Sequence, residues 1–224
     1  MRHLLSLLGA ACMVSCGSSQ GSEVLLEGPY SVVWKGNIDL EGAGKLDEIF
    51  LRSAPKSITF VESFGGTRAA TERVVALVRA HALQTQARGN CRSACALAFL
   101  AGRDRTMLAP LRGEAPTMLG LHGYYHSKTH LLLTPEPGDT AYLREVTGGR
   151  MSAELIHKVT NTTNIRGGLM VLESSIASAK RVPDVIYCDS PVEGEKLRCE
   201  TVPGQTAASL GLIDWAAPVG SPQP

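Results

Sequence analysis

The stretch Ser57-Ile-Thr-Phe-Val-Glu-Ser-Phe-Gly-Gly66 places a short apolar segment directly before two glycines. Residues 57–62 are rich in β-branched and aromatic side chains, which predicts a strand. Ser63 to Gly66 predicts a turn, because glycine adopts backbone conformations that other residues avoid. Residues 67–82 then carry apolar side chains three and four apart, which predicts an amphipathic helix.

The same alternation continues on both sides of this unit. Further strands are expected at 31–38, 85–88, 117–121 and 185–188, and further helices at 44–52, 94–101, 139–159, 168–180 and 206–210. Strands that alternate with helices predict an α/β fold built on a parallel sheet with right-handed crossovers. We expect one domain over residues 29–219, with a helical arm at about 139–182.

Composition limits the class of function. The chain has 224 residues, of which 44% are hydrophobic, so it can form a substantial core and is not disordered as a whole. Lys and Arg number 22 and Asp and Glu 21, which gives a net charge of +1. This balance argues against nucleic acid as a partner, because phosphate binding needs a basic surplus.

The first residues have the features of an export signal. Met1-Arg2-His3 is basic, and residues 4–14 form an apolar run that is too short to span a bilayer but typical of a signal peptide. Met13-Val-Ser-Cys16 resembles a bacterial lipobox, which predicts a lipoprotein signal peptide over 1–16, lipidation of Cys16 and a flexible tether over 17–28. We expect a protein lipid-anchored on the periplasmic side of a bacterial membrane; ordinary cleavage to a soluble periplasmic or secreted protein is the alternative.

The cysteines fit an oxidising compartment. Cys12 is removed with the signal peptide, and beyond Cys16 four remain: Cys91, Cys95, Cys188 and Cys199. An even count in an exported protein favours disulfides over zinc. Of the three possible pairings we favour Cys91–Cys95 and Cys188–Cys199, because each pair flanks an expected tight turn. A bridge over four residues does not fit inside a regular helix, so Cys91 must precede the helix start.

Ser93 is the first candidate for chemistry, because it lies between the Gly89-Asn90 turn and the helix expected at 94–101. Backbone N–H groups at a helix N-terminus are unpaired, so a serine there has an oxyanion stabiliser beside it. The alternative is that Ser93 simply caps the helix, which is a common use of serine at such a position.

Two further segments fit the same chemistry. The N–H of Gly66 follows an apolar strand and can approach a ligand closely. His122 ends the strand expected at 117–121, and the carboxyl ends of parallel strands are where α/β proteins form ligand sites. The alternatives are a turn that needs positive φ at the glycine and a hydrogen-bonded structural histidine.

The order strand–Ser-X-Gly-Gly–helix, then Cys-Arg-Ser-Ala-Cys and Gly-Leu-His, resembles the ClpP/crotonase superfamily, in particular its exported ClpP-like proteins of bacteria. The closing segment 206–214, ending Gly-Leu-Ile-Asp, is similar to the last helix and turn of that family. The resemblance implies a spiral of β-β-α units and a serine peptidase-type hydrolase that needs no cofactor or metal. It also implies a homo-oligomer, since relatives form trimers or larger rings.

By this resemblance Ser93 is the nucleophile and His122 the general base. The oxyanion hole is formed by the N–H groups of Gly66 and Ala94. A peptide substrate would add as a strand beside Ser63 and Gly65.

The third catalytic residue departs from the family pattern. The family Asp lies about a dozen residues before the final Gly-Leu-Ile-Asp, and that position falls on Cys199, next to Glu200. We therefore expect Glu200 to orient His122, with Asp189 or Asp184 as alternatives. If none of these carboxylates reaches the ring, the site is a Ser–His dyad or the protein is a degenerate relative that binds without cleaving.

The histidines and lysines of the chain raise two other site chemistries. His122, His126 and His130 recur every four residues, like metal ligands on one helix face, but residues 117–121 are expected to form a strand. A Ser–Lys mechanism would need a lysine in the site, and the early candidates Lys35 and Lys45 lie in no recognisable motif. The preferred function is therefore a serine peptidase, and the alternative is a non-catalytic binding or scaffold lipoprotein.

Overall fold

The computed structural model describes residues 21–180, 183–190 and 195–214. The predicted signal peptide and Cys16 lie outside the described residues, as does the end of the expected domain beyond residue 214. The elements along the chain are β1 (Glu23–Glu27), β2 (Ser31–Lys35), α1 (Leu40–Arg52), β3 (Ser57–Ser63), α2 (Arg68–Ala80), β4 (Gln84–Arg92), α3 (Ala94–Leu100), β5 (Arg105–Met107), β6 (Met118–Leu121), α4 (Pro137–Val146), α5 (Ala153–Thr160), β7 (Gly168–Leu172), α6 (Ser174–Lys180), β8 (Val185–Asp189) and β9 (Arg198–Thr201).

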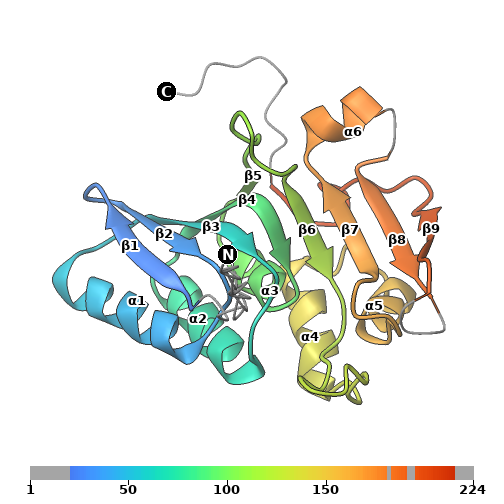
Figure 1. Cartoon of the computed structure of the whole chain (residues 1–224), viewed down its shortest axis with the longest axis horizontal. Coiled ribbons are helices and arrows are strands. Elements are labelled where there is room, and N and C mark those ends of the chain that lie inside the picture. Colours follow the sequence, from blue (N-terminus) through green and yellow to red (C-terminus); the bar gives the residue numbers. More distant parts are fainter. Residues whose placement is uncertain (1–20, 181–182, 191–194, 215–224) are drawn as a thin grey trace, which may run out of the picture.

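One sheet holds all the strands, in the order β1-β2-β3-β4-β6-β7-β8-β9, with β5 paired to β4 (Figure 1). The pairs β2–β3, β3–β4, β4–β5 and β4–β6 are parallel. The outer pairs β1–β2, β6–β7, β7–β8 and β8–β9 are antiparallel. The α/β class and the parallel central strands agree with the prediction, and the carboxyl ends of β3, β4 and β6 meet at one edge.

The helices are distributed unevenly around this sheet. In Figure 1, α1 to α5 run along the lower part of the view and α6 lies at the opposite edge, beyond the end of β7. Asp39 and Thr67 begin α1 and α2 by accepting hydrogen bonds from the N–H groups of Gly42 and Ala70. The core between sheet and helices includes the fully buried side chains of Trp34, Phe60, Phe99 and Leu119. Burial of each such side chain contributes ~2 kcal/mol.

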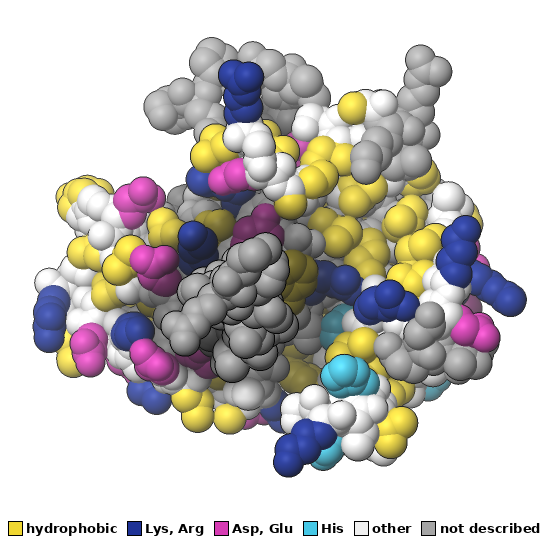
Figure 2. Space-filling model, viewed as in Figure 1, with side chains coloured by type: hydrophobic (Ala, Val, Ile, Leu, Met, Phe, Trp, Pro, Cys, Tyr) yellow, Lys and Arg dark blue, Asp and Glu magenta, His cyan; other side chains and the backbone are white. Residues whose placement is uncertain are grey.

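Hydrophobic side chains also gather over β6, β7 and β8 on the face shown in Figure 2. None of the helices in the described part of the chain is long and apolar enough to cross a membrane.

Part of the segment expected as a tether over 17–28 is a strand. Residues 23–27 form β1, which pairs antiparallel with β2. The side chain of Val24 packs into the core, with 6% of its surface exposed. Since the Gly/Ser-rich composition ends at Ser22, the apolar residues that follow gain more from burial than from remaining in a linker.

The arm expected at 139–182 is only partly helical. Helices α4 and α5 occur where predicted, separated by Gly148 and Gly149 with φ of 59° and 72°. The helix predicted over 168–180 is wrong for its first part, because residues 168–172 form β7 and only α6 is helical. Gly-Leu-Met-Val-Leu is a short, continuously apolar run, and periodicity alone does not distinguish a buried strand from a buried helix. The free edge of β6 decides the outcome, because it pairs with this segment.

Candidate active site

Ser93 occupies the junction between β4 and α3, with φ of 52° and ψ of −123°. Residues other than glycine rarely adopt this conformation, and it costs about 1–3 kcal/mol. Two links hold it in place. The N–H of Ser93 donates to the carbonyl of Gly120 at 2.8 Å, and a disulfide joins Cys91 to Cys95 around it. The strain is thus imposed by the neighbouring structure, as at sharp strand-to-helix turns that expose a nucleophile.

The hydroxyl of Ser93 does not cap α3, since it makes no capping hydrogen bond with the helix. The alternative reading of Ser93 as an ordinary N-cap is therefore wrong. The side chain instead lies against the backbone of Gly65: a Cβ built on Gly65 would be 3.4 Å from Ser93 Oγ. Gly65 itself has φ of +130°, which favours glycine at this position.

The two amides predicted for the oxyanion hole are donors without acceptors among the described residues. Ala94 is the first residue of α3, where N–H groups have no partner within the helix. Gly66 is fixed by its neighbours: Ile38 donates to Gly65 and accepts from Thr67, at 2.7 and 3.2 Å. A Cβ on Gly66 would be 1.9 Å from the carbonyl oxygen of Ile38, so only glycine fits. Their shared role in stabilising an oxyanion stays a prediction.

His122 leaves the sheet at the same edge as Ser93. Strands β4 and β6 are parallel neighbours with Arg92 opposite Gly120, so Ser93 and His122 follow adjacent strand ends. Its Nδ1 lies 2.6 Å from the carbonyl oxygen of Gly123. Because a carbonyl can only accept, this contact assigns the proton to Nδ1 and leaves the lone pair on Nε2. The described residues show no hydrogen bond between Ser93 and His122.

The His122 ring is largely buried, and burial lowers its pKa to about 4. The hydrogen bond to Gly123 acts in the opposite direction, while the charge of Arg92 lowers the pKa further. The ring is therefore neutral at pH 7, the protonation state of a general base.

Glu200 does not orient His122, which corrects the prediction. It lies in β9, three strands from β6, at a distance of ~14 Å between strand axes. Its carboxylate pairs with Lys158. The antiparallel strands β7 and β8 separate the two residues; a strand was expected at 185–188, but residues 168–172 were expected to be helical.

The alternative carboxylates are also engaged elsewhere. Asp189 accepts backbone N–H bonds from Thr163 and Asn164, at 3.0 and 2.9 Å, and Asp184 accepts one from Ala207 at 3.0 Å. The orienting partner of His122 is thus a backbone carbonyl. This geometry leaves the two arrangements without a carboxylate, a Ser–His dyad or a relative that binds without cleaving.

Two predicted features remain, Ser63 and the second disulfide. Ser63 is fully buried in β3, and its hydroxyl has no hydrogen-bond partner among the residues that the structure describes. The second predicted disulfide, Cys188–Cys199, joins β8 to β9 and confirms the pairing.

The metal and lysine alternatives gain no support. His126 and His130 lie in an exposed turn, where His126 Nδ1 accepts from Thr129, and Figure 2 shows histidines along the lower edge of the molecule. Among residues 21–180, 183–190 and 195–214 no three metal-binding side chains cluster. Lys45 pairs with Glu41 on α1, and Lys35 is exposed at the end of β2.

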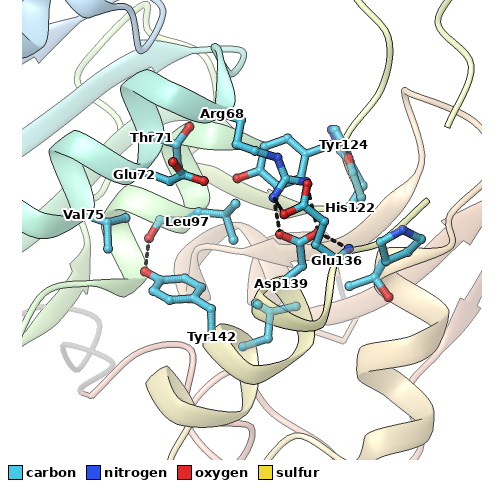
Figure 3. A pocket seen from close by; sticks show the side chains of 15 residues that line it. Arg68, Thr71, Glu72, Val75, Leu97, His122, Tyr124, Glu136, Asp139 and Tyr142 are labelled. Atoms are coloured by element: carbon cyan, nitrogen blue, oxygen red, sulfur yellow. Dashed lines mark hydrogen bonds and ion pairs between the residues drawn. The ribbon is translucent and has the colours of Figure 1, made fainter. Parts of the chain in front are cut away.

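A cavity of about 250 Å³ opens beside His122, between α2, α3 and α4 (Figure 3). Its polar lining includes Arg68, Glu72, Tyr124 and Asp139, none of which was predicted as a site residue. Arg68 and Asp139 form a two-pronged ion pair at 2.8 and 3.1 Å although they are 71 residues apart. No motif in the sequence signals such a pairing.

No family model matches the chain, and no curated protein matches it either. Among solved structures, the chain is similar to a membrane-bound stomatin-specific protease. A serine-to-alanine mutant of that protease shares 16% identity over 59% of this chain and 69% of that chain, with a TM-score of 0.41. A lysine-to-alanine mutant in complex with a substrate peptide shares 14% identity, over 66% and 70%, with a TM-score of 0.47.

The chain is also similar to ClpP1 from Listeria monocytogenes, with 15% identity over 82% of this chain and 88% of that chain and a TM-score of 0.46. The likeness to these proteases is one of fold alone. At such identities and TM-scores, it assigns neither residues nor activity.

Proposed function

We propose that this chain is a serine hydrolase of the peptidase type, with Ser93 as nucleophile and His122 as general base. One observation carries the proposal: Ser93 is held in a strained conformation at the end of β4, with a hydroxyl that does not cap α3. Strain of this kind persists where the surrounding structure imposes it, and it concentrates at functional sites.

The proposed reaction has two stages. Nε2 of His122 takes the proton of Ser93 Oγ as the oxygen attacks a peptide carbonyl, and the N–H groups of Gly66 and Ala94 stabilise the oxyanion. The carbon–nitrogen bond then breaks, and His122 returns the proton to the leaving amine. Water then attacks the acyl group on Ser93 while His122 takes a proton from it. The bond between the acyl carbon and Ser93 Oγ breaks, His122 returns the proton to Oγ, and the acid product leaves.

The substrate itself would complete this arrangement. The hydroxyl–imidazole hydrogen bond of an unliganded site often forms or tightens only when substrate binds. A peptide added along the edge near Gly65 would cover Ser93 and exclude water from the site.

The proposal also includes export and lipidation at Cys16. Both disulfides support it, because such bonds persist in oxidising compartments outside the cytosol. A homo-oligomer belongs to the same proposal, and the hydrophobic side chains over β6 to β8 support it (Figure 2).

A second function, binding without cleavage, is favoured by one observation. His122 is oriented by the carbonyl of Gly123 and by no carboxylate, and its pKa of about 4 makes it a weak base. Such a protein would hold peptides at the same edge as a scaffold.

Incubation with a mixed peptide library separates the two functions. Mass spectrometry should show new peptide termini with the unchanged protein and with Ser127→Ala, which alters an exposed serine. No new termini should appear with Ser93→Ala. An intact library in the presence of the folded, unchanged protein would contradict the enzymatic proposal.

A further inference from the structure

The cavity beside His122 has an apolar middle. Val75 of α2, Leu97 of α3 and Leu143 of α4 line it, together with the ring of Tyr142. The hydroxyl of Tyr142 donates to the carbonyl of Leu97 at 2.6 Å, which fixes the ring in the wall. At about 250 Å³ the cavity is smaller than sites for drug-sized ligands, roughly 300–1,000 Å³, and suits a single side chain.

The polar groups of this cavity carry an excess of negative charge. Glu72, Glu136 and Asp139 face one guanidinium, that of Arg68. Arg68 is already engaged: it pairs with Asp139 at 2.8 Å, lies 3.5 Å from Glu136 and stacks on the Tyr124 ring at 3.9 Å. Glu72 forms no ion pair or hydrogen bond within the described part of the chain, and it lies one helical turn from Arg68 on α2 (Figure 3).

His122 supplies an independent sign that a ligand enters here. Its ring is largely buried and lines the cavity, and Nε2 has no hydrogen-bond partner among the described residues. Nε2 is not one of the fully enclosed polar atoms of the described residues, so a group that enters the cavity can reach it. The cavity therefore adjoins the group that would handle the proton of the reaction.

We propose that this cavity binds the side chain of a lysine or arginine next to the bond to be cleaved, so that the substrates are peptides with basic residues there. This inference rests on the proposed function. The aliphatic stem of such a side chain fits the walls formed by Val75, Leu97 and Leu143, and its cationic end pairs with the free carboxylate of Glu72. A glutamate side chain would meet like charges, and a leucine would leave Glu72 unpaired.

Matched peptides that differ at one position test the inference. We expect kcat/KM for the peptide with lysine or arginine at this position to exceed kcat/KM for the leucine peptide at least tenfold. It should exceed kcat/KM for the glutamate peptide by a larger factor. Glu72→Gln should reduce the preference for lysine over leucine about fivefold, and Glu72→Lys should favour glutamate. Glu48→Gln, which changes an exposed carboxylate on α1 away from the cavity, should leave the preference unchanged. Equal rates for lysine and leucine would overturn the inference.

A second measurement separates failure of the inference from failure of the proposed function. A small fluorophosphonate reacts with an activated serine without requiring a peptide side chain. Labelling of Ser93 together with a preference for leucine would overturn the basic specificity and leave the peptidase in place. If Ser93 is not labelled, fluorescence anisotropy with Ser93→Ala protein still tests the cavity. Tighter binding of the lysine peptide than of the leucine peptide supports it, and equal binding overturns it.

Discussion

The backbone N–H of Ser93 donates a hydrogen bond to the carbonyl oxygen of Gly120 at 2.8 Å, two residues before His122. This bond ties the strained turn at the end of β4 to the strand that carries the proposed base. The two candidate catalytic residues are thus positioned by adjacent strands of the sheet rather than by loops, which favours precise placement.

Replacement of Ser93 by glycine should stabilise the fold while removing the nucleophile. Glycine adopts φ of 52° without the penalty borne by serine, and part of the gain is offset by the entropy of the unfolded chain. We expect the free energy of unfolding of Ser93→Gly to exceed that of Ser93→Ala by about 1 kcal/mol, measured by urea denaturation. Equal stability of the two variants would show that the backbone at this position is relaxed.

The proposed active site should depend on pH through His122. Burial lowers the pKa of this ring to about 4, so the unfolded chain binds more protons between pH 6.5 and 4. The stabilising contribution, on the order of 3 kcal/mol, is present above pH 6.5 and is lost as the pH falls toward 4. His122→Gln should flatten this dependence in urea titrations at several pH values.

The lowered pKa of His122 also affects the pH dependence of catalysis. The neutral ring is available as a base above its lowered pKa, so the acid limb of kcat/KM should lie between pH 4 and 5. An acid limb near pH 6.5 to 7 would mean that the ring is solvated in the working enzyme.

The two disulfides should differ in their effects on activity and stability. Loop-closure entropy predicts a loss of about 2 kcal/mol for opening Cys91–Cys95 and about 3 kcal/mol for opening Cys188–Cys199. Only the first brackets Ser93, so Cys91→Ala with Cys95→Ala should lower kcat/KM at least tenfold. The more destabilising pair of changes, at 188 and 199, should leave kcat/KM within about twofold. The reverse ranking of activities would contradict a positioning role for the first bridge.

Gly65 should be needed for activity beyond its backbone conformation. A Cβ at this position would lie 3.0 Å from the Cβ of Ser93, while a Cβ on Gly113 would meet nothing within 4 Å. Both glycines have positive φ, so Gly65→Ala and Gly113→Ala should each lose about 1 kcal/mol of stability. Peptide hydrolysis should fall only in Gly65→Ala, and a comparable loss in Gly113→Ala would refute the steric explanation.

Local sequence patterns predicted the features that depend on local structure. The strand–glycine turn–helix unit, both disulfides and the position of Ser93 before α3 follow from neighbouring residues and their periodicity. His122 was predicted at the end of a strand because residues 118–121 are continuously apolar. These signals require no knowledge of which strands pair.

The incorrect or missing predictions concern features that depend on contacts between segments far apart in the sequence. Glu200 was expected near His122, but β7 and β8 pair between them, and the apolar run of β7 resembles a buried helix in sequence. The pairing of Arg68 with Asp139 depends on how α4 packs beside α2, which spacing along the chain does not reveal.

The central claim is that Ser93 is an activated nucleophile whose proton is taken by His122. Intact-protein and peptide mass spectrometry after treatment with a fluorophosphonate tests it most directly. The account predicts a single adduct on Ser93, at least a hundredfold slower labelling in His122→Gln, and no adduct in Ser93→Ala with an unchanged melting temperature. An unlabelled Ser93 in the folded, disulfide-bonded protein would contradict the account and leave a binding domain in place of an enzyme.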